Sequence, residues 1–170
     1  MWNKLKDKRI TNSKRGSIFI EFAVVLPLLV FFLFMIIYMG LFMHDYVALN
    51  NITRSAARFV AVSTSGAKAA EGGYTDAVMQ TKTTNLVAYL IDNEKGKLML
   101  YNVNFDQIMY VDSANLSSVE NGDKGYVFKG NDGKTVNVVM KAVKSDDSPL
   151  LVDEFIPDVL TSALKMKLED

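Results

Sequence analysis

The strongest pattern in the sequence is an apolar run near its N-terminus. Phe22 to Met43 contains no Asp, Glu, Lys, Arg or His. As a helix that rises 1.5 Å per residue, this run would span roughly 33 Å, enough to cross the hydrocarbon core of a membrane. A secretory signal peptide has a shorter apolar region followed by a small-residue cleavage site, and neither feature fits here. We therefore predict a transmembrane helix over residues 17–43.

An apolar stripe at helical spacing predicts that the same helix continues outside the membrane over residues 44–63. We expect the stripe to pack on the domain that follows, with Asp45, Arg54 and Arg58 largely off it. The single histidine, His44, is interpreted as an interfacial residue rather than a ligand or a base. The stripe consists of Phe42, Tyr46, Leu49, Ile52, Ala56 and Phe59.

Residues 64–170 are predicted to form an exported α+β domain. The small residues and glycines of Ser63–Gly73 predict the end of the long helix, and a second helix is expected over Tyr74–Asp92. From Lys97 onward, apolar runs and alternating patterns predict strands, two of them around the Asn-Asp-Gly turn and a last one in "SALKMKLE". Between these, "SDDSPLLVDEFIPDVL" is read as a loop with a short helical piece. The pattern favours an antiparallel sheet backed by helices.

Charge distribution adds a topology to this picture. Lys+Arg and Asp+Glu both total 19, but residues 1–16 carry six Lys or Arg and only one Asp. A basic head before an apolar run stays on the cytoplasmic side, so the C-terminal domain is expected to be extracytoplasmic. The rest of the chain is acidic on balance, which argues against a nucleic-acid partner.

Candidate catalytic chemistry is sparse. The chain has no cysteine and one histidine, which excludes thiolate catalysis and leaves no credible Ser-His-Asp set. Asp132, Asp146 and Asp147 do not have the spacing of an EF-hand calcium loop, and no phosphate-binding glycine pattern occurs. We predict no catalytic residue, no cofactor and no metal site, although metal binding by the loop aspartates stays open.

One carboxylate, Glu21, stands at the start of the apolar run, where a charge is costly. It follows Gly16 by five residues, in "KRGSIFIEF". Cleavage after Gly16 would leave Ser17 as a new N-terminus with Glu21 as the fifth residue, which is the type IV prepilin pattern. Glu21 could then pair with the Ser17 amine of a neighbouring subunit, so that two costly charges become tolerable together. Alternatively, Glu21 lies one turn inside the interface and reaches water.

The segment from about residue 14 to residue 63 resembles the TadE-like (TadE/TadF) pseudopilins of tight-adherence (Tad, or Flp) type IV pilus systems. The resemblance rests on Glu21-Phe22-Ala23, on Pro27 six residues after the glutamate, and on "RSAAR" at residues 54–58. Ordinary type IV pilins more often have "FTLIE" after the glycine and a later first proline. The size of the C-terminal domain argues for a minor subunit, because the major Flp pilin is very short.

The resemblance implies a pilin-like transmembrane helix packed on the exported domain, with residues 1–16 as a leader that a prepilin peptidase removes between Gly16 and Ser17. It implies that Glu21 and Phe22 serve subunit pairing and assembly, and Pro27 is expected to kink the helix. The implied partners are the peptidase, other pilins and the Tad inner-membrane assembly machinery, besides lipid. The alternative is a signal-anchored binding or sensor protein that never joins a filament.

Overall fold

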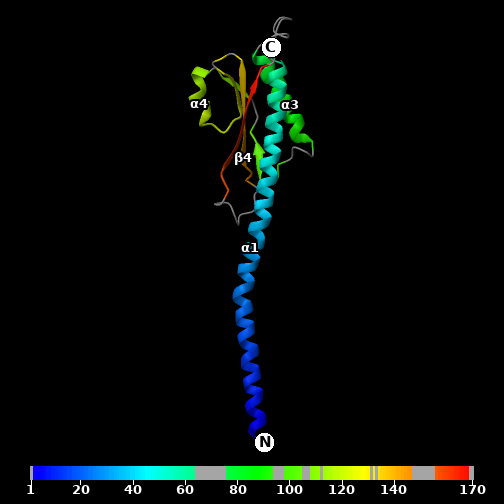
Figure 1. Ribbon diagram of the computed structural model, residues 1–170, viewed down its shortest axis with the longest axis vertical. Helices are drawn as coiled ribbons and strands as arrows, with labels where there is room; N and C mark the ends of the chain where they lie inside the picture. The colour runs from blue at the N-terminus through cyan, green and yellow to red at the C-terminus, as the bar shows by residue number, and fades with distance from the viewer. Residues whose placement is uncertain are drawn as a thin grey trace. The chain divides into compact units, whose positions relative to one another are not determined.

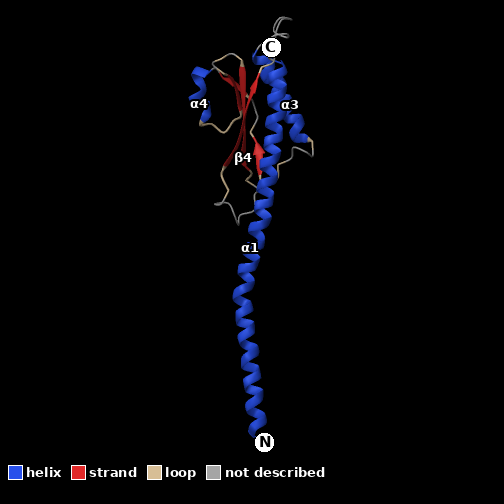
Figure 2. Cartoon of the chain, viewed as in Figure 1, coloured by secondary structure: helices blue, strands red, loops and turns tan. Residues whose placement is uncertain are grey.

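The computed structural model describes residues 2–63, 76–93, 98–104, 108–111, 113–130, 132, 134–146 and 156–168, with side chains described from Ile18 onward. The chain divides into two compact units, residues 1–40 and 41–170. Its fold class is α+β, as predicted: a long N-terminal helix precedes a small domain with a five-stranded sheet (Figure 2).

The long helix α1 runs from Trp2 to Ser63 without interruption. Within the first unit, residues 18–37 are all exposed, although nearly all of them are apolar. A helix that is apolar all round belongs in a core or in a membrane, because water solvates neither of its faces favourably. The helix ends at Ser63, where the small residues and glycines were predicted to stop it; residues 64–75 lie outside the described part of the chain.

The second unit is built on a mixed sheet with β4 at its centre. Strands β1 and β3 pair with one edge of β4, β5 pairs with the other edge, and β2 pairs with β3. The strands are β1 Tyr101–Val103, β2 Met109–Val111, β3 Tyr126–Lys129, β4 Thr135–Lys144 and β5 Val159–Lys167. The predicted pair of strands around the Asn-Asp-Gly turn is confirmed as β3 and β4.

The prediction of a wholly antiparallel sheet needs one correction, because β2 and β3 are parallel. Parallel neighbours cannot be joined by a tight hairpin and need a crossover connection. Here the crossover contains the 3-10 helix η2, Ser113–Asn115, and the short helix α4, Leu116–Glu120. Sequence patterns did not predict either helix, since five residues are too few to show a helical period.

The two faces of the sheet are covered by different elements (Figure 1). On the inner face, Ser162 of β5 donates its hydroxyl hydrogen to Asn50 Oδ1 of α1 at 2.7 Å. On the outer face, the Lys141 ammonium of β4 donates to the backbone carbonyls of Glu120 and Gly122 at the end of α4. The predicted second helix is confirmed as α3, Asp76–Asp92, and buries Met79, Thr83 and Val87.

The core of the second unit joins the C-terminal part of α1 to the strands. Its α1 members recur at spacings of three and four residues, as a helix face packed on a sheet requires. The stripe therefore packs on the domain as predicted, but Asp45 lies within it and Tyr46 is exposed. The buried residues that α1 contributes from position 41 onward are Asp45, Ala48, Leu49, Ile52, Thr53, Ala56, Ala57, Val60 and Ala61.

Candidate functional site

The residues predicted for processing and assembly all lie on α1, in the first unit. Gly16 and Ser17 are within the helix, and for residues before Ile18 only the backbone is described. Glu21 and Phe22 are exposed, and Phe22 as a whole residue is 66% accessible to solvent. The functions assigned to these residues stay predictions.

The helical spacing of Ser17 and Glu21 has a chemical consequence. Residues four apart lie one above the other on the same helix face. After cleavage, Ser17 would begin the helix with a positive α-amine, and Glu21 would stand one turn further along. Cleavage would thus place a positive charge one helical turn from the Glu21 carboxylate.

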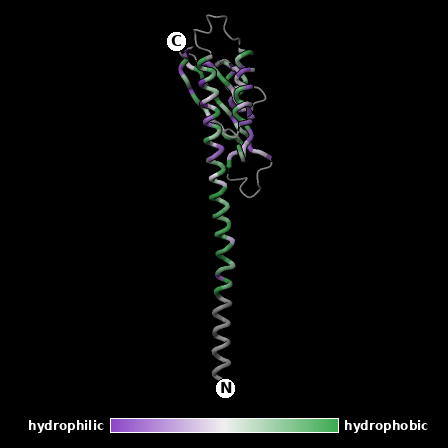
Figure 3. The backbone as a smooth tube through the Cα atoms, turned by 90° about the vertical axis from the view of Figure 1, so that its right-hand side faces the viewer, coloured by the Kyte–Doolittle hydropathy of each residue, from purple (hydrophilic) through white to green (hydrophobic). Residues whose placement is uncertain are grey.

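The surface around Glu21 is continuous and apolar. Figure 3 shows the described residues of this segment coloured mainly as hydrophobic. Among the residues that the structure describes, one helix is long and apolar enough to cross a membrane, and it lies within Ile18–Val62. This finding agrees with a single membrane pass near the N-terminus.

Pro27 lies inside α1, and the helix continues through it. Proline has no N–H, so the carbonyl of Ala23, four residues earlier, receives no intrahelical hydrogen bond from this position. The kink predicted at Pro27 stays a prediction, because an unbroken helical assignment does not measure a bend.

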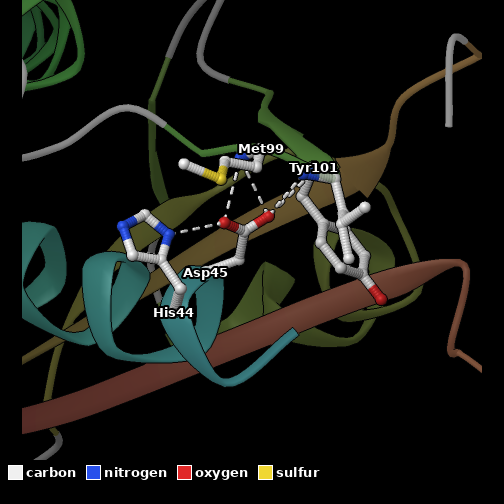
Figure 4. Close-up of polar contacts among 5 residues, drawn as sticks. His44, Asp45, Met99 and Tyr101 are labelled. Carbon is white, nitrogen blue, oxygen red and sulfur yellow. Dashed lines mark hydrogen bonds and ion pairs between the residues drawn. The ribbon is translucent and has the colours of Figure 1, made fainter. Parts of the chain in front are cut away.

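Asp45 forms a buried polar site in the second unit that joins α1 to the start of β1 (Figure 4). Its carboxylate is fully buried and accepts the backbone N–H groups of three consecutive residues where β1 begins. Met99 N lies 2.9 Å from Oδ1 and 3.1 Å from Oδ2, Leu100 N lies 2.6 Å from Oδ2, and Tyr101 N lies 3.2 Å from Oδ2. His44 Nδ1 lies 3.1 Å from Oδ1, with its ring half exposed.

The carboxylate takes the place of a neighbouring strand. The Ser145 N–H donates to the Leu100 carbonyl and the Asn104 N–H to the Lys141 carbonyl, so even-numbered residues of this stretch face β4, with the Leu100 N–H turned to Asp45 instead. In an antiparallel pair the bonding direction alternates, so the N–H of Tyr101 points away from β4. The Asp45 carboxylate accepts this N–H, so the buried carboxylate and the buried edge of β1 supply each other's hydrogen-bond partners.

Asp45 is therefore a structural residue that the sequence interpretation placed off the buried face. The signal that could have found it is its spacing: residues 45, 49, 52 and 56 form a better helical stripe than one that starts at Tyr46. A single carboxylate on such a stripe predicts a buried acceptor. His44 contacts Asp45 and has no described contact with a third polar side chain that would make the pair a catalytic set.

Tyr101 links this site to the end of the sheet. Its hydroxyl donates to the Pro157 carbonyl at 2.8 Å, and its ring packs edge-on against Phe42, 6.4 Å between centroids. Burial raises the pKa of the Tyr101 phenol, and the negative charges of Asp45 and Asp158 raise it further. Burial likewise raises the pKa of Tyr126, with Glu120 adding to the effect. Neutral phenols are thus favoured in the folded domain.

Asp132 is the one loop aspartate of the three whose bonding is described. Its Oδ1 accepts the hydroxyl hydrogen of Thr135 at 2.8 Å and the N–H groups of Lys134 and Thr135, each at 3.1 Å. These hydrogen bonds, led by that of the Thr135 hydroxyl, lower the pKa of Asp132. The carboxylate closes the β3–β4 turn. Among the described residues, no group of three or more His, Asp or Glu side chains could hold a metal ion.

No curated protein and no solved structure matches the chain. One family model does, and it begins at the glycine where cleavage was predicted and ends at the second arginine of "RSAAR". It therefore covers Glu21, Phe22, Pro27 and Asp45, but not the sheet. Through residues 16–58 the chain matches the family described as TadE-like protein, and the resemblance predicted from its sequence is confirmed.

Proposed function

We propose that this protein is a minor pilin or pseudopilin that takes part in the assembly of a Tad-type type IV pilus. The observation that carries the proposal is the family match itself, because its first residue is Gly16 and it includes Glu21 at prepilin spacing. A TadE-like protein acts by assembling with other subunits, so the proposed function is structural rather than enzymatic. Surface attachment through the pilus is the biological outcome we propose.

In this proposal a prepilin peptidase removes residues 1–16 at the cytoplasmic membrane face. The basic leader favours this topology, since Lys and Arg stay on the cytoplasmic side. The protein is then held in the bacterial inner membrane by α1 with its sheet domain outside the cytoplasm. The exposed apolar residues from Ile18 to Ile37 support a lipid environment before assembly and helix packing after it.

Glu21 is proposed to bind the Ser17 amine of a neighbouring subunit. Both groups are costly in an apolar helix bundle, and pairing lowers that cost. The exposure of Glu21 and of its neighbour Phe22 leaves both side chains available to another helix. The same amine lies one turn from Glu21 of its own chain, so the pairing partner has to be tested by cross-linking between chains.

The test of processing is co-expression of the full chain with a prepilin peptidase, followed by mass spectrometry of the new N-terminus. Gly16→Val should block cleavage, because a branched side chain obstructs the residue before the scissile bond. Gly40→Val is the matched control: it makes the same substitution in the same helix, at a position where a Cβ meets nothing within 4 Å. The proposal fails if the wild-type chain keeps Met1 in the presence of active peptidase.

The test of assembly is Glu21→Ala in cells that make the pilus. We expect processed protein to accumulate in the membrane, with little in sheared pilus fractions and few cross-links to other pilins. Leaving a neighbour's amine unpaired in a buried site costs on the order of 3–5 kcal/mol. Glu21→Asp should assemble partly, since it keeps the charge with a shorter reach. Wild-type assembly by Glu21→Ala would leave Glu21 as an interfacial residue only.

A further inference from the structure

The longest open edge among the described strands belongs to β5. Residues Val159–Lys167 pair with β4 along a continuous register, from Thr135↔Lys167 to Val143↔Val159, with no bulge. Within the described chain no strand pairs with the other side of β5. Strand edges are templates for another strand, and proteins block them with short length, bulges, proline or charge. β5 is long and regular, and Pro157 precedes it rather than interrupting it.

The hydrogen bonds at both ends of β5 determine which of its groups are free. The Lys144 N–H donates to the Asp158 carbonyl at 2.9 Å, and the Leu168 N–H donates to the Lys134 carbonyl at 2.7 Å. Residues 158 and 168 therefore bond to β4, and in an antiparallel pair alternate residues do so. The N–H and C=O groups that point to the open edge are those of residues 159, 161, 163, 165 and 167.

The charge on this edge is uneven. Thr161, Ala163, Lys165 and Lys167 are all exposed. The half from Val159 to Ala163 carries no charge, whereas the half that follows has a lysine at each outward position. The positive charge of Lys165 helps to lower the pKa of the Asp132 carboxyl. A strand laid on this edge would thus find open backbone groups throughout and two ammonium groups at one end.

We propose that the open edge of β5 binds an extended acidic segment of a partner protein by strand addition. Backbone hydrogen bonds to the five outward residues would supply affinity, and Lys165 and Lys167 would select Asp or Glu at the facing positions. A second copy of this chain that presents its own β5 is a poorer occupant. The β5 segment of a second copy, Val159–Lys167, carries two lysines and no carboxylate, so it offers no acidic group to Lys165 and Lys167.

The experiment uses the full chain in detergent micelles and a blocked nine-residue peptide that alternates threonine with glutamate. Amide hydrogen exchange by NMR reports each residue of β5 separately. In the free protein, the amides of residues 159, 161, 163, 165 and 167 should exchange fast, and those of 160, 162, 164 and 166 slowly. The acidic peptide should slow the odd-numbered set at least about tenfold and leave the even-numbered set unchanged.

Two variants and one control peptide make the result specific. Thr161→Pro removes an outward N–H without touching the ladder to β4 and should weaken peptide binding more than about tenfold. Lys165→Glu combined with Lys167→Glu keeps every backbone group and should transfer the preference to a threonine–lysine peptide. The wild-type chain should bind that basic peptide at least about tenfold more weakly than the acidic one.

Three results would overturn the proposal. Odd-numbered amides already protected in the free protein would mean that the edge is covered. A lack of protection by either peptide would mean that Lys165 and Lys167 serve only to block strand addition. Equal protection by the acidic and the basic peptide would remove the claim of an acidic partner. None of these results bears on cleavage after Gly16, so the test is independent of the proposed function.

Discussion

Replacing Asp45 by alanine removes the acceptor for three backbone N–H groups at once. Two of these donors belong to Leu100 and Tyr101, which are 2% and 0% exposed, so water cannot readily replace the carboxylate. An unsatisfied buried donor costs about 1–3 kcal/mol, and two of them give about 2–6 kcal/mol. Met99 is 61% exposed, and we expect water to satisfy its N–H. The total is a large share of the 5–15 kcal/mol that stabilises a typical domain.

Asp45→Asn should cause a smaller loss of stability than Asp45→Ala. The asparagine amide keeps one oxygen that can accept a hydrogen bond, but it lacks the negative charge that strengthens these bonds. Its NH₂ group is itself a donor and would face the backbone N–H groups at the start of β1. Hydrogen bonds to charged groups contribute about 1.5–3 kcal/mol against about 0.5–1.5 kcal/mol for neutral pairs. We therefore expect Asp45→Asn to lose about half as much stability as Asp45→Ala. Asn51→Ala is the control, because Asn51 is exposed on the same helix.

The assay is hydrogen exchange of the full chain in detergent over a denaturant series, which gives a free energy of opening for each segment. The peptides that cover β1 and β4 report on the sheet domain. For Asp45→Ala, their free energy of opening should fall by about 2–6 kcal/mol, with little change for Asn51→Ala. A difference below about 0.5 kcal/mol between the two variants would refute the view that the carboxylate stabilises the edge of β1.

Three further predictions concern the sheet domain. Thr83→Val should raise the free energy of unfolding by about 1 kcal/mol, because the Thr83 hydroxyl is buried and has no hydrogen-bond partner among the described residues; denaturant titration measures this, and a loss of stability would contradict it. The pKa of the Tyr101 phenol is higher in the folded protein than in the unfolded chain, where it is about 10, so the neutral phenol stabilises the fold below pH 10 and this contribution is lost as pH rises through the folded pKa. The fall in stability between pH 10 and 12 should therefore be smaller in Tyr101→Phe. A fragment of residues 41–170 should protect the amides of β4, whereas a fragment of residues 64–170 should not, since it lacks the buried α1 residues; equal protection would show that α1 is dispensable for the core.

The elements that local pattern determines were predictable from sequence. The long helix, α3 and the β3–β4 hairpin all depend on residues near one another in the chain, through helical period, strand alternation and turn chemistry. The parallel pairing of β2 with β3 was not predictable, because it depends on a crossover whose helix α4 is too short to leave a period.

The prepilin-like segment and the Asp45 site also differ in how far they could be predicted from the sequence. The prepilin-like segment was recognised because its information is contiguous, from Gly16 to Pro27, and the family match confirms that resemblance. The Asp45 site was missed because its partners lie 54 to 56 residues away, at Met99 to Tyr101. They are also backbone groups, which leave no mark in the sequence.

The crossover between β2 and β3 has a practical consequence for work on this protein. The Lys141 ammonium of β4 holds the crossover by donating hydrogen bonds to the main-chain carbonyls of Glu120 and Gly122. No residue of α4 is buried. The attachment thus depends on the path of the backbone and hardly on the identity of the side chains that follow it. A side chain of residues 116–119 can therefore be replaced by cysteine for a fluorescent label, so that the protein can be followed in living cells with its backbone path and core intact.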